Sequence, residues 1–284
     1  MAANLRSDNL PPVALCSTGI PGLDDVLAGG LTPNRLYLLE GIPGSGKTTL
    51  AMQFLMEGAR RGEPVLYVTL SESEDELRGV AASHGWSLEG ITVRELAPSE
   101  DSLRPDDQYT MFHPSEVELG ETIDPAELCP GEFTHAIRHA VETLGVTIVV
   151  IDSLNGYLNA MPGEKFLVVQ LHELLSYLGQ SGVATLLIGA HQGLIGSAMI
   201  TPEDASYLAD AVILMRYYKT KGEVRQAIPV MKKRGGAHEH TIRDAKIENG
   251  GIHIGPPLRE FGGVLTGVPI HEKDEDKLGA RDRP

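Results

Sequence analysis

The sequence predicts an α/β fold: a mainly parallel β-sheet flanked by helices, with antiparallel strands at its C-terminal side. Apolar segments of strand length alternate with segments of helical periodicity from about residue 17 to residue 192. Segments such as VTIVVI and VATLLIGA are apolar on both faces, which is typical of parallel strands covered by helices on both sides. Beyond Asp210, strand segments follow one another through short turns, as in antiparallel sheets.

Local signals mark the individual elements. Helices are expected at 23–27, within 41–63 after a glycine loop, within 71–85, at 132–145 and at 163–182, and strands at 35–40, 64–70, 91–97, 146–154, 183–192, 211–218, 224–234, 240–248 and 251–256. Gly29 and Gly30 suit the left-handed turn after the first helix. Ser73 with Glu76 forms a capping-box pattern. Pro229 cannot donate to a ladder, so its strand is expected at an edge or a bulge.

The chain is expected to hold one folded domain, residues 17–262, between a flexible N-terminal lead, 1–16, and a flexible charged tail, 263–284. From Pro98 to about Gly131 the sequence is acidic, rich in proline and without periodicity. Loops of this length usually bind, cover or dock something.

Composition excludes several classes of protein. The formal net charge of -15 argues against broad nucleic-acid affinity, since neutralisation of phosphates by Lys and Arg supplies most of that affinity. No apolar run approaches the roughly 20 residues that span a bilayer, and the N-terminus lacks a secretory signal, so a cytoplasmic protein is expected. Cys16 and Cys129 have no CxxC spacing and are expected to be plain thiols.

The segment GIPGSGKT, Gly41–Thr48, predicts a site for ATP and Mg²⁺. It matches GxxxxGK[ST] between an expected strand and an expected helix. Backbone N–H groups of such a loop surround the phosphates, Lys47 reaches the β and γ phosphates, and Thr48 offers a hydroxyl to Mg²⁺. The residues expected to bind the nucleotide are Gly41, Pro43, Gly44, Ser45, Gly46, Lys47, Thr48 and Thr49.

Carboxylates that follow two strands are candidates for the metal and the water. Asp152 ends an apolar strand and is expected to hold the water shell of Mg²⁺ opposite Thr48; the alternative is a helix cap. Glu72 is the candidate for the group that positions the attacking water, because it lies nearest the end of its strand. The alternative for this segment is an acidic first turn that suits the helix dipole. The other acids there are Glu74, Asp75 and Glu76.

The segment MKKRGGAHEH, Met231–His240, is locally basic in an acidic chain. Between Arg216 and Lys246 there are nine Lys or Arg residues against three acids, so an anion is expected there. Period two along a strand puts Lys232 and Arg234 on one face and Lys233 on the other. The alternative is a sheet edge protected by lysine.

The motifs STGIPGLDDVLAGGL, GIPGSGKTTLAMQF, VLYVTLSES, SHGW, IVVIDSL and MKKRGGAHEH together resemble the KaiC branch of the RecA/RadA-type P-loop ATPases. The resemblance covers residues 17–262 and implies a RecA-like fold, a closed ring of usually six copies, and ATP between neighbouring copies. It further implies that Lys232, Arg234 and His238 reach the γ phosphate held by a neighbour. The chain resembles a single-domain member with a signalling or clock-like role, which implies a protein partner.

Two positions depart from the family pattern. The family often shows two glutamates where this chain has Ser71 and Glu72, so Glu72 acts alone or more weakly. The adjacent phosphoacceptor pair of the kinase-type domain is matched by Ser206 and Tyr207. Serine/threonine autokinase activity therefore rests on Ser206, and a locally hydrogen-bonded serine is the favoured alternative.

Two other functions share this core. A DNA-pairing recombinase needs basic loops, yet no Lys or Arg lies between Gln192 and Arg216. A nucleotide-gated scaffold would bind ATP with little turnover.

His135 and His139 have metal-ligand spacing without a third ligand in register, so surface or core histidines are expected. Trp86 is expected to be a packing residue.

Overall fold

The computed structural model describes residues 14–96, 130–160, 167–190, 205–220, 222–259, 261–262 and 270–271. Most of the expected N-terminal lead, the acidic segment, the tail and Cys129 lie outside these ranges. Cys16 is a buried thiol, and within the described ranges no helix has the length and apolar character that crossing a membrane requires.

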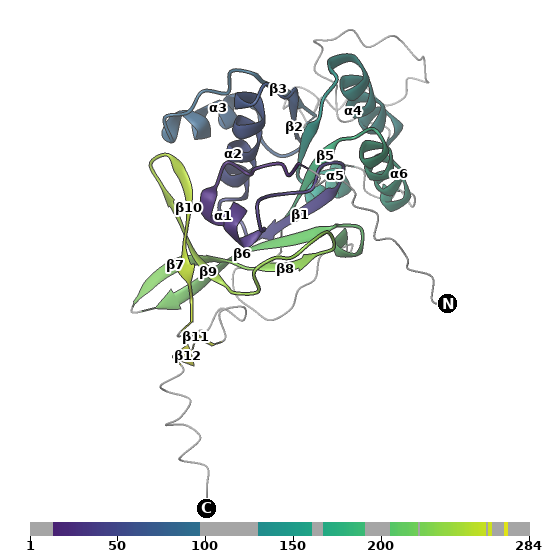
Figure 1. Ribbon diagram of the computed structural model, residues 1–284. Helices are drawn as coiled ribbons and strands as arrows, with labels where there is room; N and C mark the ends of the chain where they lie inside the picture. The colour runs from purple at the N-terminus through teal and green to yellow at the C-terminus, as the bar shows by residue number, and fades with distance from the viewer. Residues whose placement is uncertain are drawn as a thin grey trace, which may run out of the picture.

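Among the described residues, ten strands form one sheet in the order β10-β9-β7-β6-β1-β5-β4-β2-β3, with β8 paired to β6 (Figure 1). The strands β1 to β6 run parallel to one another, and β7 to β10 are each antiparallel to the strands with which they pair. The bounds are β1 Leu36–Gly41, β2 Val65–Thr69, β3 Ile91–Glu95, β4 Ile148–Asp152, β5 Ala184–Ala190, β6 Ala211–Thr220, β7 Glu223–Ile228, β8 Val230–Lys233, β9 Arg243–Glu248 and β10 Gly251–Pro257; β11 Phe261–Gly262 and β12 Ile270–His271 form a separate pair. The predicted fold class is confirmed.

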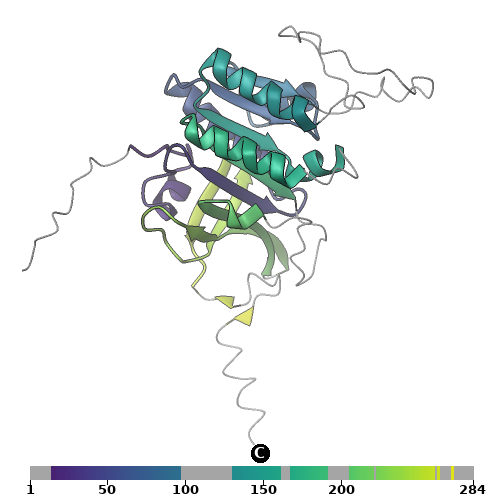
Figure 2. The same cartoon turned by 90° about the vertical axis from the view of Figure 1, so that its right-hand side faces the viewer.

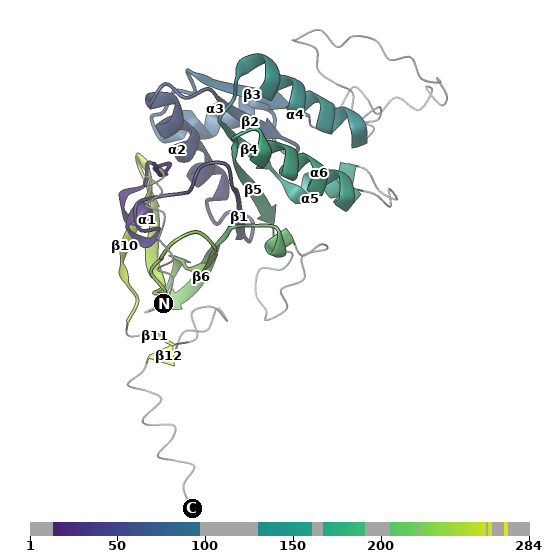
Figure 3. The same ribbon diagram turned by 45° about the vertical axis from the view of Figure 1, so that its right-hand side comes forward.

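Helices cover both faces of the parallel part of the sheet (Figures 1 and 3). The bounds are α1 Pro21–Val26, α2 Lys47–Arg60, α3 Glu74–Ser83, α4 Pro130–Leu144, α5 Leu154–Ala160 and α6 Leu167–Gln180, with a short 3₁₀ helix at Ala205–Tyr207. In β4, Ile148 and Val150 join the core beneath α1 to α3, whereas Val149 and Ile151 join the core beneath α4 to α6. This two-sided burial explains why the strand segments are apolar throughout.

The helices α4 and α6 lie side by side on one face of the sheet (Figure 2). The Arg138 guanidinium lies 4.2 Å from the centre of the Tyr177 ring, whose hydroxyl donates to Glu142. His135 and His139 are exposed on α4 with their rings 6.1 Å apart. No group of three metal-ligating side chains occurs in the described part of the chain.

The prediction that a strand covers residues 146–154 is wrong at the C-terminal end. The strand β4 ends at Asp152, and α5 begins at Leu154. The reason is Ser153, whose hydroxyl accepts the N–H of Gly156 at 3.2 Å and so satisfies a donor of the first helical turn. The peptide bond between Asp152 and Ser153 is cis.

The strand expected at 224–234 is divided into β7 and β8 by Pro229. The carbonyl of Pro229 still accepts the N–H of Leu214 at 3.0 Å, while the register of β6 and β8 shifts beside it. The predicted bulge is therefore confirmed. The capping box of Ser73 and Glu76 and the positive φ of Gly29 and Gly30 are confirmed as well.

Candidate nucleotide-binding site

The loop Gly41–Thr48 joins the carboxyl end of β1 to the start of α2, as the motif requires. Gly44 and Gly46 have φ values of 76° and 99°, which favour glycine. A Cβ at Gly41 would lie 2.5 Å from the Ser45 hydroxyl oxygen and 2.8 Å from the Met215 carbonyl oxygen. The loop thus has the glycines that a tight turn around phosphates needs.

Lys47 and Ser45 supply polar groups inside this loop. The Lys47 ammonium donates to the Ile42 carbonyl at 3.0 Å. Burial lowers the pKa of Lys47, and the nearby carboxylates of Asp152 and Glu72 oppose that shift. The Ser45 hydroxyl oxygen is buried and has no hydrogen-bond partner. An anion in the loop would serve both groups. Of the other predicted binding residues, Thr49 is buried in α2 and Pro43 is exposed.

Asp152, at the end of β4, collects two hydroxyl donors. The Thr48 hydroxyl donates to Asp152 Oδ2 at 3.2 Å, and the Tyr67 hydroxyl donates to the same oxygen at 2.7 Å. Burial raises the pKa of Asp152, while Tyr67, Thr48 and Lys47 oppose the shift in that order. A hydroxyl and a carboxylate at this spacing form the oxygen donor set that Mg²⁺ prefers beside nucleotide phosphates, so the residues fit that ion.

Glu72 lies between β2 and α3 and faces this cluster. Its backbone N–H donates to the Thr69 hydroxyl at 3.1 Å, and the same hydroxyl donates to the Glu72 carbonyl at 2.6 Å. Its Oε2 atom is buried without a hydrogen-bond partner. Burial raises the pKa of Glu72, Asp152 and Glu76 raise it further, and Lys47 opposes them.

The other acids of this segment are engaged elsewhere. Glu74 pairs with Arg78, Glu76 closes the capping box on Ser73, and Asp75 is exposed. Glu72 is the member of the four whose charge interacts with Lys47 and Asp152.

The basic segment divides around β8 as strand alternation predicts. Lys232 donates to the Ser206 carbonyl at 2.9 Å, and Arg234, just beyond the strand, donates to the Tyr207 carbonyl at 2.6 Å. Lys233 instead donates to the carbonyls of Leu27 and, at 3.3 Å, Gly30. Lys232 and Arg234 thus hold the 3₁₀ turn, and Lys233 holds the end of α1.

These two cations are not brought to the phosphate loop of their own chain. The Arg234 N–H donates to the Asp210 carbonyl, and the Asp210 N–H donates to the Leu36 carbonyl. Arg234 therefore lies beside Leu36, the first residue of β1, whereas the phosphate loop begins at Gly41, the last residue of β1. Five residues at about 3.3 Å each separate the two ends by about 17 Å along the strand.

His238 lies near Lys233. Its Nε2 atom is buried without a partner, although only part of the residue is shielded from solvent. Burial lowers the pKa of His238, His240 and Lys233 lower it further, and a hydrogen bond to the backbone of Val230 opposes them. The rings of His238 and His240 meet edge to face at 4.4 Å.

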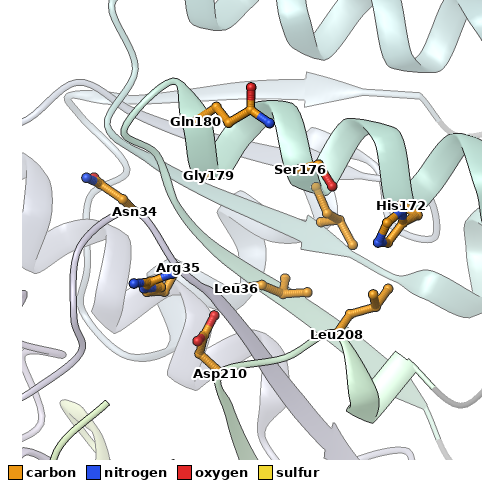
Figure 4. A pocket seen from close by; sticks show the side chains of 10 residues that line it. Asn34, Arg35, Leu36, His172, Ser176, Gly179, Gln180, Leu208 and Asp210 are labelled. Carbon is orange, nitrogen blue, oxygen red and sulfur yellow. The ribbon is translucent and has the colours of Figure 1, made fainter. Parts of the chain in front are cut away.

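A cavity of about 400 Å³ lies at the same amino end of the sheet (Figure 4). Its lining includes Arg35 beside β1, His172 and Gln180 on α6, and Leu208 and Asp210 before β6. It is separate from the phosphate loop and adjoins the 3₁₀ turn held by Lys232 and Arg234.

Several residues of the site carry no motif. Tyr67 in β2 was not predicted, although it stands two residues before Thr69 on the same face of the strand, which is the available signal. Tyr217 and Gln226, which contact the phosphate loop, come from strands more than 170 residues away, and the sequence has no local sign of that contact.

Comparison with known proteins agrees with this geometry. Residues 16–259 match the family described as ATPase: KaiC. The chain is 28% identical over 255 residues to the circadian clock protein KaiC3 of Synechocystis, covering 90% of this chain and 46% of that protein. It is 30% identical over 243 residues to a UPF0273 protein of Methanopyrus kandleri, covering 84% and 91%. It is 25% identical to the circadian clock oscillator protein KaiC of Picosynechococcus, covering 97% and 49%, so the chain spans about half the length of these KaiC proteins. The chain belongs to the KaiC ATPase family.

Proposed function

We propose that this chain binds MgATP between neighbouring copies in a homo-oligomeric ring, expected to have six members, and hydrolyses it. The phosphates would lie in the loop Gly41–Thr48, where backbone N–H groups and the Lys47 ammonium offset their charge. Thr48 and Asp152 would hold Mg²⁺. The ion, when bound, neutralises charge on the β and γ phosphate oxygens.

Glu72 is proposed as the general base for the attacking water. Its Oε2 atom is buried and unpaired, so it can accept a proton from water without breaking another hydrogen bond. The water oxygen forms a bond to the γ phosphorus, the bond to the bridging oxygen breaks, and the proton passes to Glu72. ADP and inorganic phosphate leave. The raised pKa of Glu72 makes its carboxylate a stronger base for this proton.

The ring is supported by one observation above all: Arg234 stands about 17 Å along β1 from the loop that it would have to serve, more than its side chain can span. Lys232 points the same way, to the 3₁₀ turn. A site that needs these cations for the γ phosphate is therefore completed by a second copy. His238 lies near Lys233, on the other side of β8, so its position does not support a place beside these cations. Such a contact is heterologous, and it closes into a ring when the rotation between copies permits.

The proposed biological role is regulatory. Some relatives are named as circadian clock proteins, and we extend to this chain only the general role of an ATP-driven ring whose surface signals to a protein partner. Phosphate transfer to Ser206 is a second candidate activity, because the Ser206 backbone contacts Lys232, the cation proposed to reach the γ phosphate. Transfer would join the Ser206 hydroxyl oxygen to the γ phosphorus, break the bond from that phosphorus to the bridging oxygen, and release ADP and the hydroxyl proton.

A nucleotide-gated scaffold is the alternative if turnover is very slow, and it is favoured by the single carboxylate at Glu72. Incubation with γ-labelled ATP and Mg²⁺, followed by native mass measurement, tests these functions together. The proposal predicts a ring, labelled inorganic phosphate, and loss of that product in Glu72→Gln. Bound ATP without product would favour the scaffold, and label on Ser206 would favour the kinase. In a parallel incubation with single-stranded DNA, a strong rise in phosphate release would favour a recombinase.

A further inference from the structure

The antiparallel strands that follow the parallel sheet pack directly on the phosphate loop. Tyr217 on β6 donates from its hydroxyl to the Gly44 carbonyl at 2.5 Å. Gln226 on β7 donates from its side-chain amide to the Ser45 carbonyl at 3.3 Å. On β9, the Ile247 Cδ1 atom lies 2.5 Å from the place where a Cβ of Gly46 would be. The strands β6, β7 and β9, which are neighbours in the sheet (Figure 1), thus contact three successive loop residues.

The pairing of the strands explains this match. Tyr217 is directly opposite Gln226, and Gln226 is directly opposite Ala245, so these positions share one face of the sheet. Ile247 lies two residues beyond Ala245 on that face. Tyr218, the next residue of β6, points to the other face, where its hydroxyl donates to Asp244 at 2.7 Å.

Both side-chain donors act on carbonyls of the loop. A planar trans peptide carries its C=O and N–H on opposite sides. A donor that holds the Gly44 and Ser45 carbonyls toward the antiparallel strands therefore turns the N–H groups of Ser45 and Gly46 away from those strands, into the loop, where the Ser45 N–H donates to the Ile42 carbonyl at 3.2 Å. Loops of this type bind phosphates through such N–H groups.

We propose that Tyr217 and Gln226 are positioning residues that hold the phosphate loop in its binding conformation, with Ile247 closing the loop behind Gly46. This inference rests on the proposed binding of nucleotide by that loop. Neither side chain needs to touch the nucleotide, so their removal weakens the affinity for the phosphates while the hydrolysis step at Glu72 proceeds.

The test compares Tyr217→Phe and Gln226→Leu with Tyr218→Phe, a matched control from the same strand. MgADP binding is measured by calorimetry, ATP turnover by phosphate release, and stability by thermal unfolding without nucleotide. Loss of one neutral hydrogen bond corresponds to roughly a three- to tenfold change in an equilibrium constant. We expect Kd and KM to rise roughly three- to tenfold in Tyr217→Phe and in Gln226→Leu, and further in the double variant, with kcat within about twofold of wild type. Tyr218→Phe lowers the thermal midpoint and leaves Kd unchanged.

Unchanged Kd in the two loop variants, or an equal rise in Tyr218→Phe, would overturn the positioning role alone. A wild-type chain that binds no MgADP would overturn the proposed function and this inference with it. The two failures are therefore distinguishable.

Discussion

Lys232 and Lys233 are adjacent in β8, and their ammonium groups bond on opposite sides of the strand. Lys232 reaches the Ser206 carbonyl at the 3₁₀ turn, whereas Lys233 reaches the Leu27 and Gly30 carbonyls after α1. One lysine therefore faces the edge proposed to meet a neighbouring copy, and the other stabilises the fold. Substitutions at the two positions are expected to separate these roles.

Lys233→Met is expected to destabilise the nucleotide-free chain by about 1 kcal/mol. The carbonyls of Leu27 and Gly30 lose a charged donor, which costs roughly 1–3 kcal/mol, and relief from burying the ammonium offsets part of that loss. The lowered pKa of Lys233 has the same cause, burial. Urea unfolding measures the change. Lys232→Met is the comparison: it loses the Ser206 carbonyl, whereas Lys233→Met loses the carbonyls of both Leu27 and Gly30, so the Lys232→Met midpoint should fall less while its turnover falls. Equal midpoints for both variants would contradict the division of roles.

Tyr67→Phe is expected to raise the Mg²⁺ concentration for half-maximal turnover by about tenfold. The Tyr67 hydroxyl holds Asp152 Oδ2 at 2.7 Å, and loss of a group that orients a metal-binding carboxylate commonly costs 10-fold or more in metal affinity. A Mg²⁺ titration of the ATPase rate measures this, with nucleotide binding in EDTA expected to stay unchanged. Tyr37→Phe is the control, because the Tyr37 hydroxyl donates to the Thr32 carbonyl near the start of β1, at the opposite end from the phosphate loop. A wild-type Mg²⁺ requirement in Tyr67→Phe would show that Tyr67 does not support Mg²⁺ binding at Asp152.

Glu72→Gln is expected to reduce turnover about 10²- to 10⁴-fold, the usual contribution of a general base. It should also make the nucleotide-free chain more stable at neutral pH. The pKa of Glu72 is raised above 4.5 in the folded chain, so the folded chain binds more protons than the unfolded chain between 4.5 and the raised value. The unfolding free energy that Glu72 contributes therefore falls as pH rises through that window and stays low above it.

Urea unfolding of wild type and Glu72→Gln across this pH range measures the effect. The two midpoints should approach each other below pH 4.5 and diverge above it, with the variant more stable. Divergence in the opposite direction would show that Glu72 is stabilised as a carboxylate in the empty site. Glu74→Gln is the control, because that acid pairs with Arg78 on the surface.

The sequence predicts features that depend on neighbouring residues and misses those that depend on distant contacts. Alternating apolar segments were sufficient for the parallel sheet, because two-sided burial in β4 leaves a direct mark on composition. The strand break at Pro229 followed from a missing N–H. The start of α5 at Leu154 was missed, although Ser153 is a common capping residue, because the apolar run before it favours strand.

The site shows the same division. The loop Gly41–Thr48 could be found from its spacing, whereas Tyr217 and Gln226 reach it only through strand pairings formed far along the chain. Tyr67 carries no motif, since a buried tyrosine in a strand is indistinguishable from a packing residue until Asp152 is placed beside it.

The proposal that two copies share each nucleotide is tested most directly by mixing two inactive variants. Arg234→Ala keeps the phosphate loop and lacks the cation for its neighbour, so it should bind ATP normally and lose about 10³-fold or more in turnover. Lys47→Ala has the opposite defect. In a one-to-one mixture that exchanges copies, roughly one interface in four combines an intact loop with an intact Arg234, so about a quarter of the wild-type rate should return. A mixture as inactive as its components, or a wild-type chain that turns over at full rate as a monomer, would contradict the account.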